Sequence, residues 1–247
     1  AGGTATLFRT LLDAGMMHGD AATCMGTEFD RFVGEPTLSG DTLAWSPPVA
    51  QSLDPAILTS VEQPFADEGG VRLLTGNLGR SVIKVSAVAQ EHQRVTAPAV
   101  VIDDQNALKA LFDASELNRD CIVVVRFQGP AANGMPELHK LTPMLGVLQD
   151  RGYSVALVTD GRMSGASGKV PAAIHLTPEA SVGGVLAKVM NGDMIALDAQ
   201  AGTLELLVTE EELSARPTAV APQVPNTVGR SLFGQARKVV TSAEEGA

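Results

Sequence analysis

The chain has 247 residues, of which 45% are hydrophobic and 19% are charged, a composition typical of globular proteins with a sizeable core. Its net charge of −10 argues against nucleic acid or an anionic membrane as a general partner. The sequence contains no secretion signal and no apolar run long enough to span a bilayer, so we expect a cytoplasmic protein.

The first predicted element is a helix over residues 3–17. Apolar side chains recur at Leu7, Leu11 and Leu12, which is the spacing of one helix face. Gly15 follows them, and glycine is a common residue just past the end of a helix. We therefore expect a short amphipathic helix with a glycine stop.

The next segment separates this helix from the rest of the chain. Residues 34–55 are rich in Gly, Pro, Ser and Asp, which predicts a loop or linker. The chain also starts abruptly at Ala1, as though upstream sequence were missing. We predict that residues 1–52 are the tail of an upstream domain with its linker, and that residues 53–247 form a carboxy-terminal domain.

Beyond residue 53 the sequence favours short strands that are rich in β-branched residues. Six such segments are predicted: Val82–Val88, Ala99–Ile102, Cys121–Phe127, Val155–Thr159, Met194–Leu197 and Leu204–Val208. Helical patterns lie between them, over Asn106–Leu117, Glu137–Gln149 and Pro178–Met190, the last with Thr177 as its N-cap. An extended proline-rich tail over residues 216–226 precedes a final surface helix over Arg230–Val240.

This order of elements predicts a mixed β/α domain. Strands outnumber helices, and Asp198–Gly202 has the length of a hairpin turn. Cys121–Val125 is continuously apolar, which is typical of a strand that is buried on both faces. We expect a sheet or barrel with a few flanking helices and not a doubly wound sheet.

Three loops carry residues suited to ligand binding. In the segment 158–171 an apolar strand ends at Thr159, and three glycines, two serines, Arg162 and Lys169 follow. Glycines let the backbone approach a ligand and direct N–H groups at an anion. A flexible loop is the simpler alternative, and neither a P-loop nor a nucleophile elbow fits the spacing.

The second loop spans residues 126–140 and places Glu137 directly after Pro136. Glu137 is either an acidic residue in the first turn of a helix, which stabilises the helix dipole, or a carboxylate ligand for Mg²⁺. The third loop, residues 75–80, offers Asn77 to a polar ligand, although a plain glycine turn explains it equally well. The two cysteines, Cys24 and Cys121, are far apart and do not form a four-cysteine metal site.

Several of these segments together resemble the dehydratase family that contains dihydroxy-acid dehydratase and 6-phosphogluconate dehydratase. The resemblance rests on VTDGRMSGASGKVPAAIHLTPEA at 158–180, GNLGRSVIKVSAV at 76–88 and RFQGPAANGMPELHKL at 126–141. The opening AGGTATLFRTLLDAGMMHGD resembles the junction between the two domains of the family, whose members are far longer. The residues of segments 133–141 and 166–175 resemble the 6-phosphogluconate branch most closely.

The resemblance implies both a fold and a chemistry. The fold is a swivelling β-barrel-like domain with flanking helices, similar to the swivelling domain of aconitases. The chemistry is loss of water from 6-phosphogluconate to give 2-keto-3-deoxy-6-phosphogluconate. An iron–sulfur cluster, held by cysteines of the missing amino-terminal domain, binds the leaving hydroxyl. A Mg²⁺ ion holds the carboxylate end, and a serine alkoxide removes the proton from carbon 2. A homodimer is expected.

Matching motif to motif, the resemblance implies that the serine base is Ser164 and that the Mg²⁺ carboxylate is Glu137. Weaker candidates for contacts with the substrate or its phosphate are Asn77, Arg80, Arg162, Ser167 and Lys169. No position of this chain matches the cluster ligands. Two alternatives stay open: the same reaction on another 2,3-dihydroxy acid, and a non-catalytic swivelling binding module.

Overall fold

A computed structural model describes residues 1–24, 26–164, 168–223 and 227–247 of the chain. Clustering of contacts divides the chain into two compact units, Ala1–Glu68 and Gly69–Ala247. Among the described residues, no helix combines the length and the apolar character that a membrane crossing demands.

The described residues of the first unit form a helix, a 3-10 turn at Phe29–Phe32 and a hairpin. Helix α1, Gly3–Asp13, ends in a Schellman motif, in which Met16 N donates to Leu11 O at 2.8 Å and Gly15 N donates to Leu12 O at 2.9 Å. Gly15 has a φ of 68°, so the predicted glycine stop is confirmed. The helix itself is shorter than the predicted range of 3–17.

The predicted loop over residues 34–55 is wrong in its first half. Strands β1, Glu35–Ser39, and β2, Thr42–Ser46, pair antiparallel around a turn at Gly40 and Asp41. Most of their residues are exposed, so neither strand shows the buried apolar face that a sequence pattern would detect.

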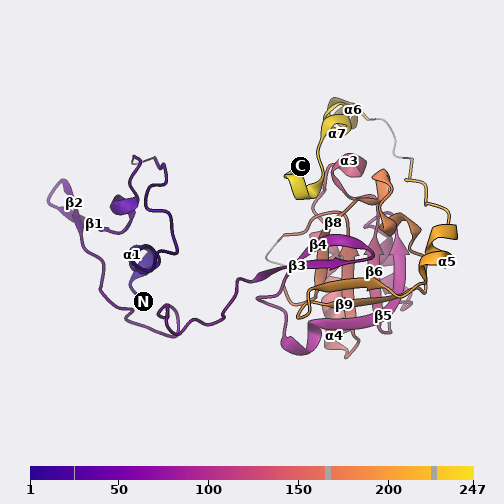
Figure 1. Ribbon diagram of the computed structural model, residues 1–247, viewed down its shortest axis with the longest axis horizontal. Coiled ribbons are helices and arrows are strands. Elements are labelled where there is room, and N and C mark those ends of the chain that lie inside the picture. Colours follow the sequence, from indigo (N-terminus) through magenta and orange to yellow (C-terminus); the bar gives the residue numbers. More distant parts are fainter. Residues whose placement is uncertain (25, 165–167, 224–226) are drawn as a thin grey trace. The chain divides into compact units, whose positions relative to one another are not determined.

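The second unit is a closed barrel of eight strands, in the order β10-β3-β4-β8-β7-β6-β5-β9 (Figure 1). Strands β5 to β8 form three parallel pairs, and β3 pairs parallel with β10, whereas the remaining pairs are antiparallel. The strands are β3 Val71–Gly76, β4 Gly79–Lys84, β5 Arg94–Ile102, β6 Cys121–Val125, β7 Val155–Thr159, β8 Ala172–Thr177, β9 Met194–Asp198 and β10 Thr203–Leu206. The predicted mixed β/α class is confirmed.

The core lies on both sides of the parallel strands. In β6, Ile122 and Val124 face the interior of the barrel, whereas Cys121, Val123 and Val125 face the helices outside it. These helices are α2, Ala107–Asp113, and α4, Thr142–Asp150. All five β6 side chains are fully buried, as predicted. Each contributes roughly 1–3 kcal/mol of apolar burial, so the carboxyl ends of these strands are rigid platforms for loops.

Of two further predicted helices, Glu137–Gln149 is confirmed only from Thr142 onward, as α4, and Pro178–Met190 is wrong. In the first part of Glu137–Gln149, a 3-10 turn at His139–Leu141 precedes α4, because the backbone of Glu137 pairs with Arg162 and is extended. In place of Pro178–Met190, two 3-10 turns at Ala180–Val182 and Val185–Lys188 flank Gly183 and Gly184. A side chain at Gly184 would collide with the Pro178 carbonyl, and Thr177 ends β8 without capping a helix.

The carboxy-terminal part folds back onto the barrel. Helix α5, Glu210–Ala215, is capped by the Thr209 hydroxyl, and residues 216–223 contain no helix or strand, as expected. The predicted helix over Arg230–Val240 is two short helices, α6 Val228–Leu232 and α7 Ala236–Val239. They precede a last 3-10 turn at Ala243–Glu245.

Candidate active site

The predicted functional loops follow parallel strands whose carboxyl ends lie at the same end of the barrel. The loop after β6 and the loop after β7 are joined by a parallel bridge between Glu137 and Arg162. Leu138 N also donates to Arg162 O at 3.2 Å. Because both strands are buried in the barrel wall, this bridge holds the two loops in a fixed register.

The bridge brings Glu137 and Ser164 together, as the sequence predicts. Glu137 Oε1 accepts hydrogen bonds from Ser164 N at 2.8 Å and from His139 N at 3.1 Å. Glu137 Oε2 accepts one from Arg162 Nη1 at 2.9 Å, and Arg162 Nε donates to Met135 O at 2.7 Å. These side chains are partly exposed, so a ligand can reach them.

A buried carboxylate, which the sequence analysis did not single out, lies beneath these loops. Asp160 is fully buried, directly after β7. Its carboxylate accepts from three backbone N–H groups, at 3.2 Å from Phe127, 2.9 Å from Gln128 and 2.9 Å from Ala180. Burial raises the pKa of the Asp160 carboxyl to about 6 and outweighs these donors, which lower it. Asp160 thus joins the loops after β6, β7 and β8.

Glu179 plays a similar part for α3, Pro130–Asn133. Its carboxylate accepts from Ala131 N at 3.2 Å and Ala132 N at 3.0 Å, and it also accepts from the Ser181 hydroxyl. A side chain at Gly129 would collide with this carboxylate. The contact with Glu179 therefore requires glycine at position 129, although the two residues are 50 positions apart in the sequence. Pro130 is typical of the first turn of a helix, and this signal could have suggested that an acidic residue binds the N–H groups there. It could not have identified Glu179 as that residue.

His175 is a further residue at this end of the barrel that the sequence analysis missed. It has a φ of 57° and lies where the β4–β8 pairing shifts register, so it is part of a bulge that redirects side chains. Its backbone N–H donates to Gly161 O at 2.9 Å. Burial, with the charge of Arg162, lowers the pKa of the imidazole, so His175 is neutral at pH 7.

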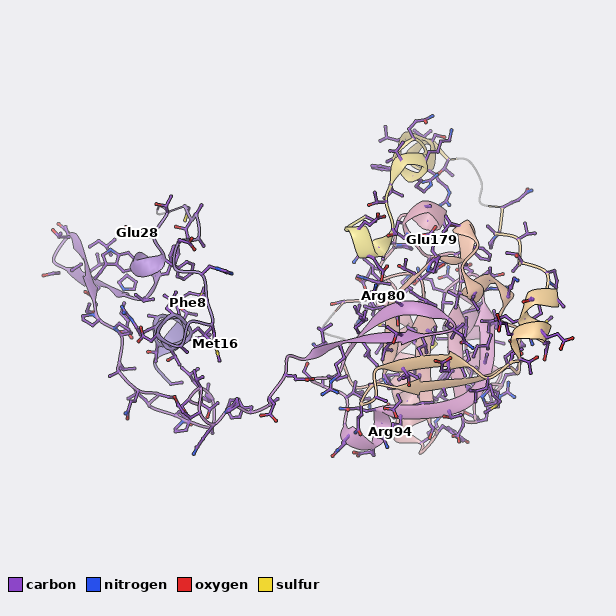
Figure 2. All side chains as sticks on the ribbon, in the orientation of Figure 1. Phe8, Met16, Glu28, Arg80, Arg94 and Glu179 are labelled. Atoms are coloured by element: carbon purple, nitrogen blue, oxygen red, sulfur yellow. The ribbon has the colours of Figure 1, made fainter. Side chains whose placement is uncertain are left out.

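The other predicted ligand residues have partners within the chain. Asn77 exchanges two hydrogen bonds of 2.8 Å with the backbone of Leu206 and so fastens the β3–β4 turn to β10. Arg80, which is labelled in Figure 2, forms an ion pair with the carboxy-terminal segment, since its Nε lies 2.9 Å from Glu244 Oε1. Lys169 Nζ contacts both carboxylate oxygens of Asp150, at 2.6 and 2.7 Å. Ser167 lies outside the described residues.

The donor groups of this chain fit a magnesium ion only in part. Among the described residues, no group of three or more His, Cys, Asp or Glu side chains could hold a metal ion. Within the described part of the chain, Glu137 Oε2 accepts one hydrogen bond, so one of its lone pairs can still ligate a hard cation. Mg²⁺ commonly takes one or two carboxylates from a protein and completes its shell with water and substrate. One ligand from Glu137 fits that pattern.

The cysteines do not fit an iron–sulfur cluster. Cys121 is fully buried in β6, and burial raises the pKa of its thiol to about 11, which disfavours the thiolate that a cluster requires. Cys24 is exposed in the other unit of the chain. The two residues therefore supply no ligand set for a cluster.

Comparisons with known proteins identify the family of the chain. Residues 56–247 match the family model described as the dihydroxy-acid/6-phosphogluconate dehydratase C-terminal domain. Phosphogluconate dehydratases of Pseudomonas aeruginosa and Escherichia coli are 56% and 52% identical to the chain over its whole length. A dihydroxy-acid dehydratase of Pyrobaculum aerophilum is 34% identical over the whole chain.

The chain spans 41% of the length of the first two of these relatives and 42% of the third. The family model covers both loops of the site and every strand of the barrel. The chain therefore belongs to the dihydroxy-acid/6-phosphogluconate dehydratase family, and it corresponds to the carboxy-terminal part of its members.

Proposed function

We propose that this chain is the carboxy-terminal part of a phosphogluconate dehydratase, a hydro-lyase of the Entner–Doudoroff pathway. The reaction removes water from 6-phospho-D-gluconate and yields 2-keto-3-deoxy-6-phosphogluconate. Identities of 56% and 52% to phosphogluconate dehydratases, against 34% to a dihydroxy-acid dehydratase, support this substrate. The observation that carries the chemistry is the cluster of Glu137, Arg162 and Ser164.

In this proposal Ser164 is the base. Its oxygen takes the proton from carbon 2 of the substrate, the bond between carbon 3 and its hydroxyl oxygen breaks, and the proton passes from Ser164 to this oxygen, which leaves as water. Ser164 returns to the alkoxide, and the resulting enol tautomerises to the 2-keto product. A serine hydroxyl ionises rarely at pH 7, so nearby positive charge and N–H donors must favour the alkoxide. Arg162 lies two residues away, but Glu137 pairs with its guanidinium at 2.9 Å, so most of this charge would come from a bound Mg²⁺ ion.

Glu137 has two tasks in the proposal. It orients the Ser164 backbone through the 2.8 Å hydrogen bond, and it would be the carboxylate that this chain contributes to a Mg²⁺ ion. A bound Mg²⁺ would supply positive charge for the carboxylate of the substrate and for an adjacent hydroxyl. Asn77, Arg80, Ser167 and Lys169 remain proposed substrate contacts of lower rank. The ion pairs of Arg80 and Lys169 would have to open before either could bind a ligand.

The remaining parts of the proposal concern the intact enzyme. We propose that an amino-terminal domain supplies the ligands of an iron–sulfur cluster, since the cysteines of this chain do not fit one. The barrel would act as a swivelling domain similar to that of aconitases, joined to residues 1–52 as a remnant of the upstream domain. The intact enzyme would be a cytoplasmic homodimer.

The test compares Ser164→Ala with Ser154→Ala in the full-length enzyme. Ser154 is an exposed serine directly before β7, at the end of the strand opposite to the site, and is the matched control. Ser164→Ala should lower kcat for 6-phosphogluconate by about 10²- to 10⁴-fold with substrate binding retained, and Ser154→Ala should behave as the wild type. A Ser164→Ala enzyme with wild-type kcat would refute the proposal that Ser164 is the base. Preferential turnover of an unphosphorylated acid would refute the substrate.

A further inference from the structure

Most cations at the carboxyl end of the barrel are already neutralised by a carboxylate. Each of three pairs has a nitrogen–oxygen distance between 2.7 and 2.9 Å: Arg80 with Glu244, Arg126 with Asp103, and Arg162 with Glu137. Such a pair carries no net charge. A ligand with two negative charges therefore requires other cations.

Arg230 and Arg237 differ from these three arginines. Within the described part of the chain, neither forms an ion pair, and both are half-buried. Arg230 Nη1 donates to the amide oxygen of Asn133 at 2.8 Å, and Arg237 Nη2 donates to Arg230 O at 3.3 Å. Neutral acceptors thus position two guanidinium groups without neutralising them, which leaves their charge and their remaining N–H groups for an anion.

The two arginines line a common cavity. It has a volume of about 400 Å³ and lies between α3 and the α6–α7 segment, which adjoin at the same end of the barrel (Figure 1). Its wall includes Asn133 and Gly134, which belong to the loop that leads to Glu137. The charged cavity and the proposed magnesium ligand are therefore built on one loop.

A second cavity lies on the other side of Arg230 and continues to that loop. It has a volume of about 430 Å³, shares Arg230 and Asn133 with the first cavity, and reaches Pro136, the residue before Glu137. Amide side chains line it, among them Gln105, whose Oε1 is buried without a partner among the described residues. Amides and arginines are donors and acceptors of the kind that bind hydroxyl groups.

We infer that Arg230 and Arg237 bind the phosphate group of the substrate, and that the amide-lined cavity receives the hydroxyl-bearing carbons between this phosphate and the reacting end. The inference rests on the proposed function and identifies the residues that would select a phosphorylated over an unphosphorylated acid. A phosphate monoester carries a charge of about −1.5 to −2 at pH 7, and two planar guanidinium groups match its oxygens in charge and geometry. The phosphate is attached at the end of the sugar acid opposite to the carboxylate. A subsite beside Glu137 but separate from it is therefore required.

The test uses the full-length enzyme with 6-phosphogluconate and with gluconate as paired substrates. Arg230→Gln and Arg237→Gln should each lower the ratio of kcat/KM for the phosphorylated over the unphosphorylated acid by about 10- to 100-fold, mainly through KM. Inorganic phosphate should compete with 6-phosphogluconate in the wild type and compete less well in both variants. Arg237→Lys should retain part of the ratio, because it keeps the charge and loses the planar fork.

Arg151→Gln is the matched control. Arg151 Nη1 also donates to an asparagine oxygen, that of Asn118 at 2.9 Å, but it follows α4 and lines neither cavity. Its ratio should equal that of the wild type. Equal losses with both substrates in the Arg230 and Arg237 variants would show a structural role and overturn the subsite, as would an unchanged ratio. A wild-type enzyme that dehydrates neither acid would instead refute the proposed function.

Discussion

Gly161→Ala tests whether the two site loops are pressed together as tightly as their register implies. A Cβ at Gly161 would lie 2.7 Å from Gln128 Cβ and 2.9 Å from Leu138 Cδ1, about 0.7 Å short of the 3.4 Å at which ordinary contact begins. Gln128 cannot yield, since its amide and backbone make hydrogen bonds to three other residues and to Asp160. Leu138 is fully buried. The loops must therefore separate.

This separation should lower both stability and activity. Overpacking of this kind costs about 1–3 kcal/mol, which for a unit of this size corresponds to a Tm lower by roughly 2–12 °C. Glu137 and Ser164 lie on opposite loops, so a shift approaching 1 Å between them should lower kcat by about 100-fold.

The assay combines thermal unfolding of the chain with kcat of the full-length enzyme. Gly69→Ala is the control, because a Cβ there meets nothing within 4 Å. We expect Gly69→Ala to match the wild type in both measurements. A Gly161→Ala protein with the wild-type Tm and the wild-type kcat would show that the loops are not in close contact, and the proposed assembly of the site would be refuted.

Two further predictions follow from buried groups. The pKa of Asp160 is about 6 in the folded chain and 3.8 as its ordinary value, so the folded state binds this proton more tightly and stability falls as pH rises from about 4 to 6. The loss is about 3 kcal/mol, measured by denaturant unfolding after subtraction of the Asp160→Asn profile; a stability that rises over this window would contradict it. A thiol reagent should modify the exposed Cys24 rapidly and the buried Cys121 only when the chain unfolds. Rapid modification of both thiols in the folded chain would show that Cys121 is not buried in β6.

The local sequence determined those elements whose signals lie within a few residues. Leu7, Leu11 and Leu12 with Gly15 indicated α1, and the continuous apolar run of β6 indicated a strand that is buried on both faces. The motif resemblance also implied that Glu137 and Ser164 belong to one site. The 2.8 Å hydrogen bond from Ser164 N to Glu137 Oε1 joins the two residues in the structure.

Only the tertiary structure decided which residues are available to a ligand. Thr75 pairs with Thr203 to close the barrel, although 128 positions separate them, and no local pattern predicts such a pair. Glu137 is not helical as predicted, because its bridge to Arg162 requires an extended backbone. Charge behaves in the same way. Arg80, a candidate for contacts with the substrate in the sequence analysis, is paired with Glu244, whereas Arg230 has only neutral partners among the described residues. The reason is physical: the distance along the chain does not measure the distance over which hydrogen bonds and charges act.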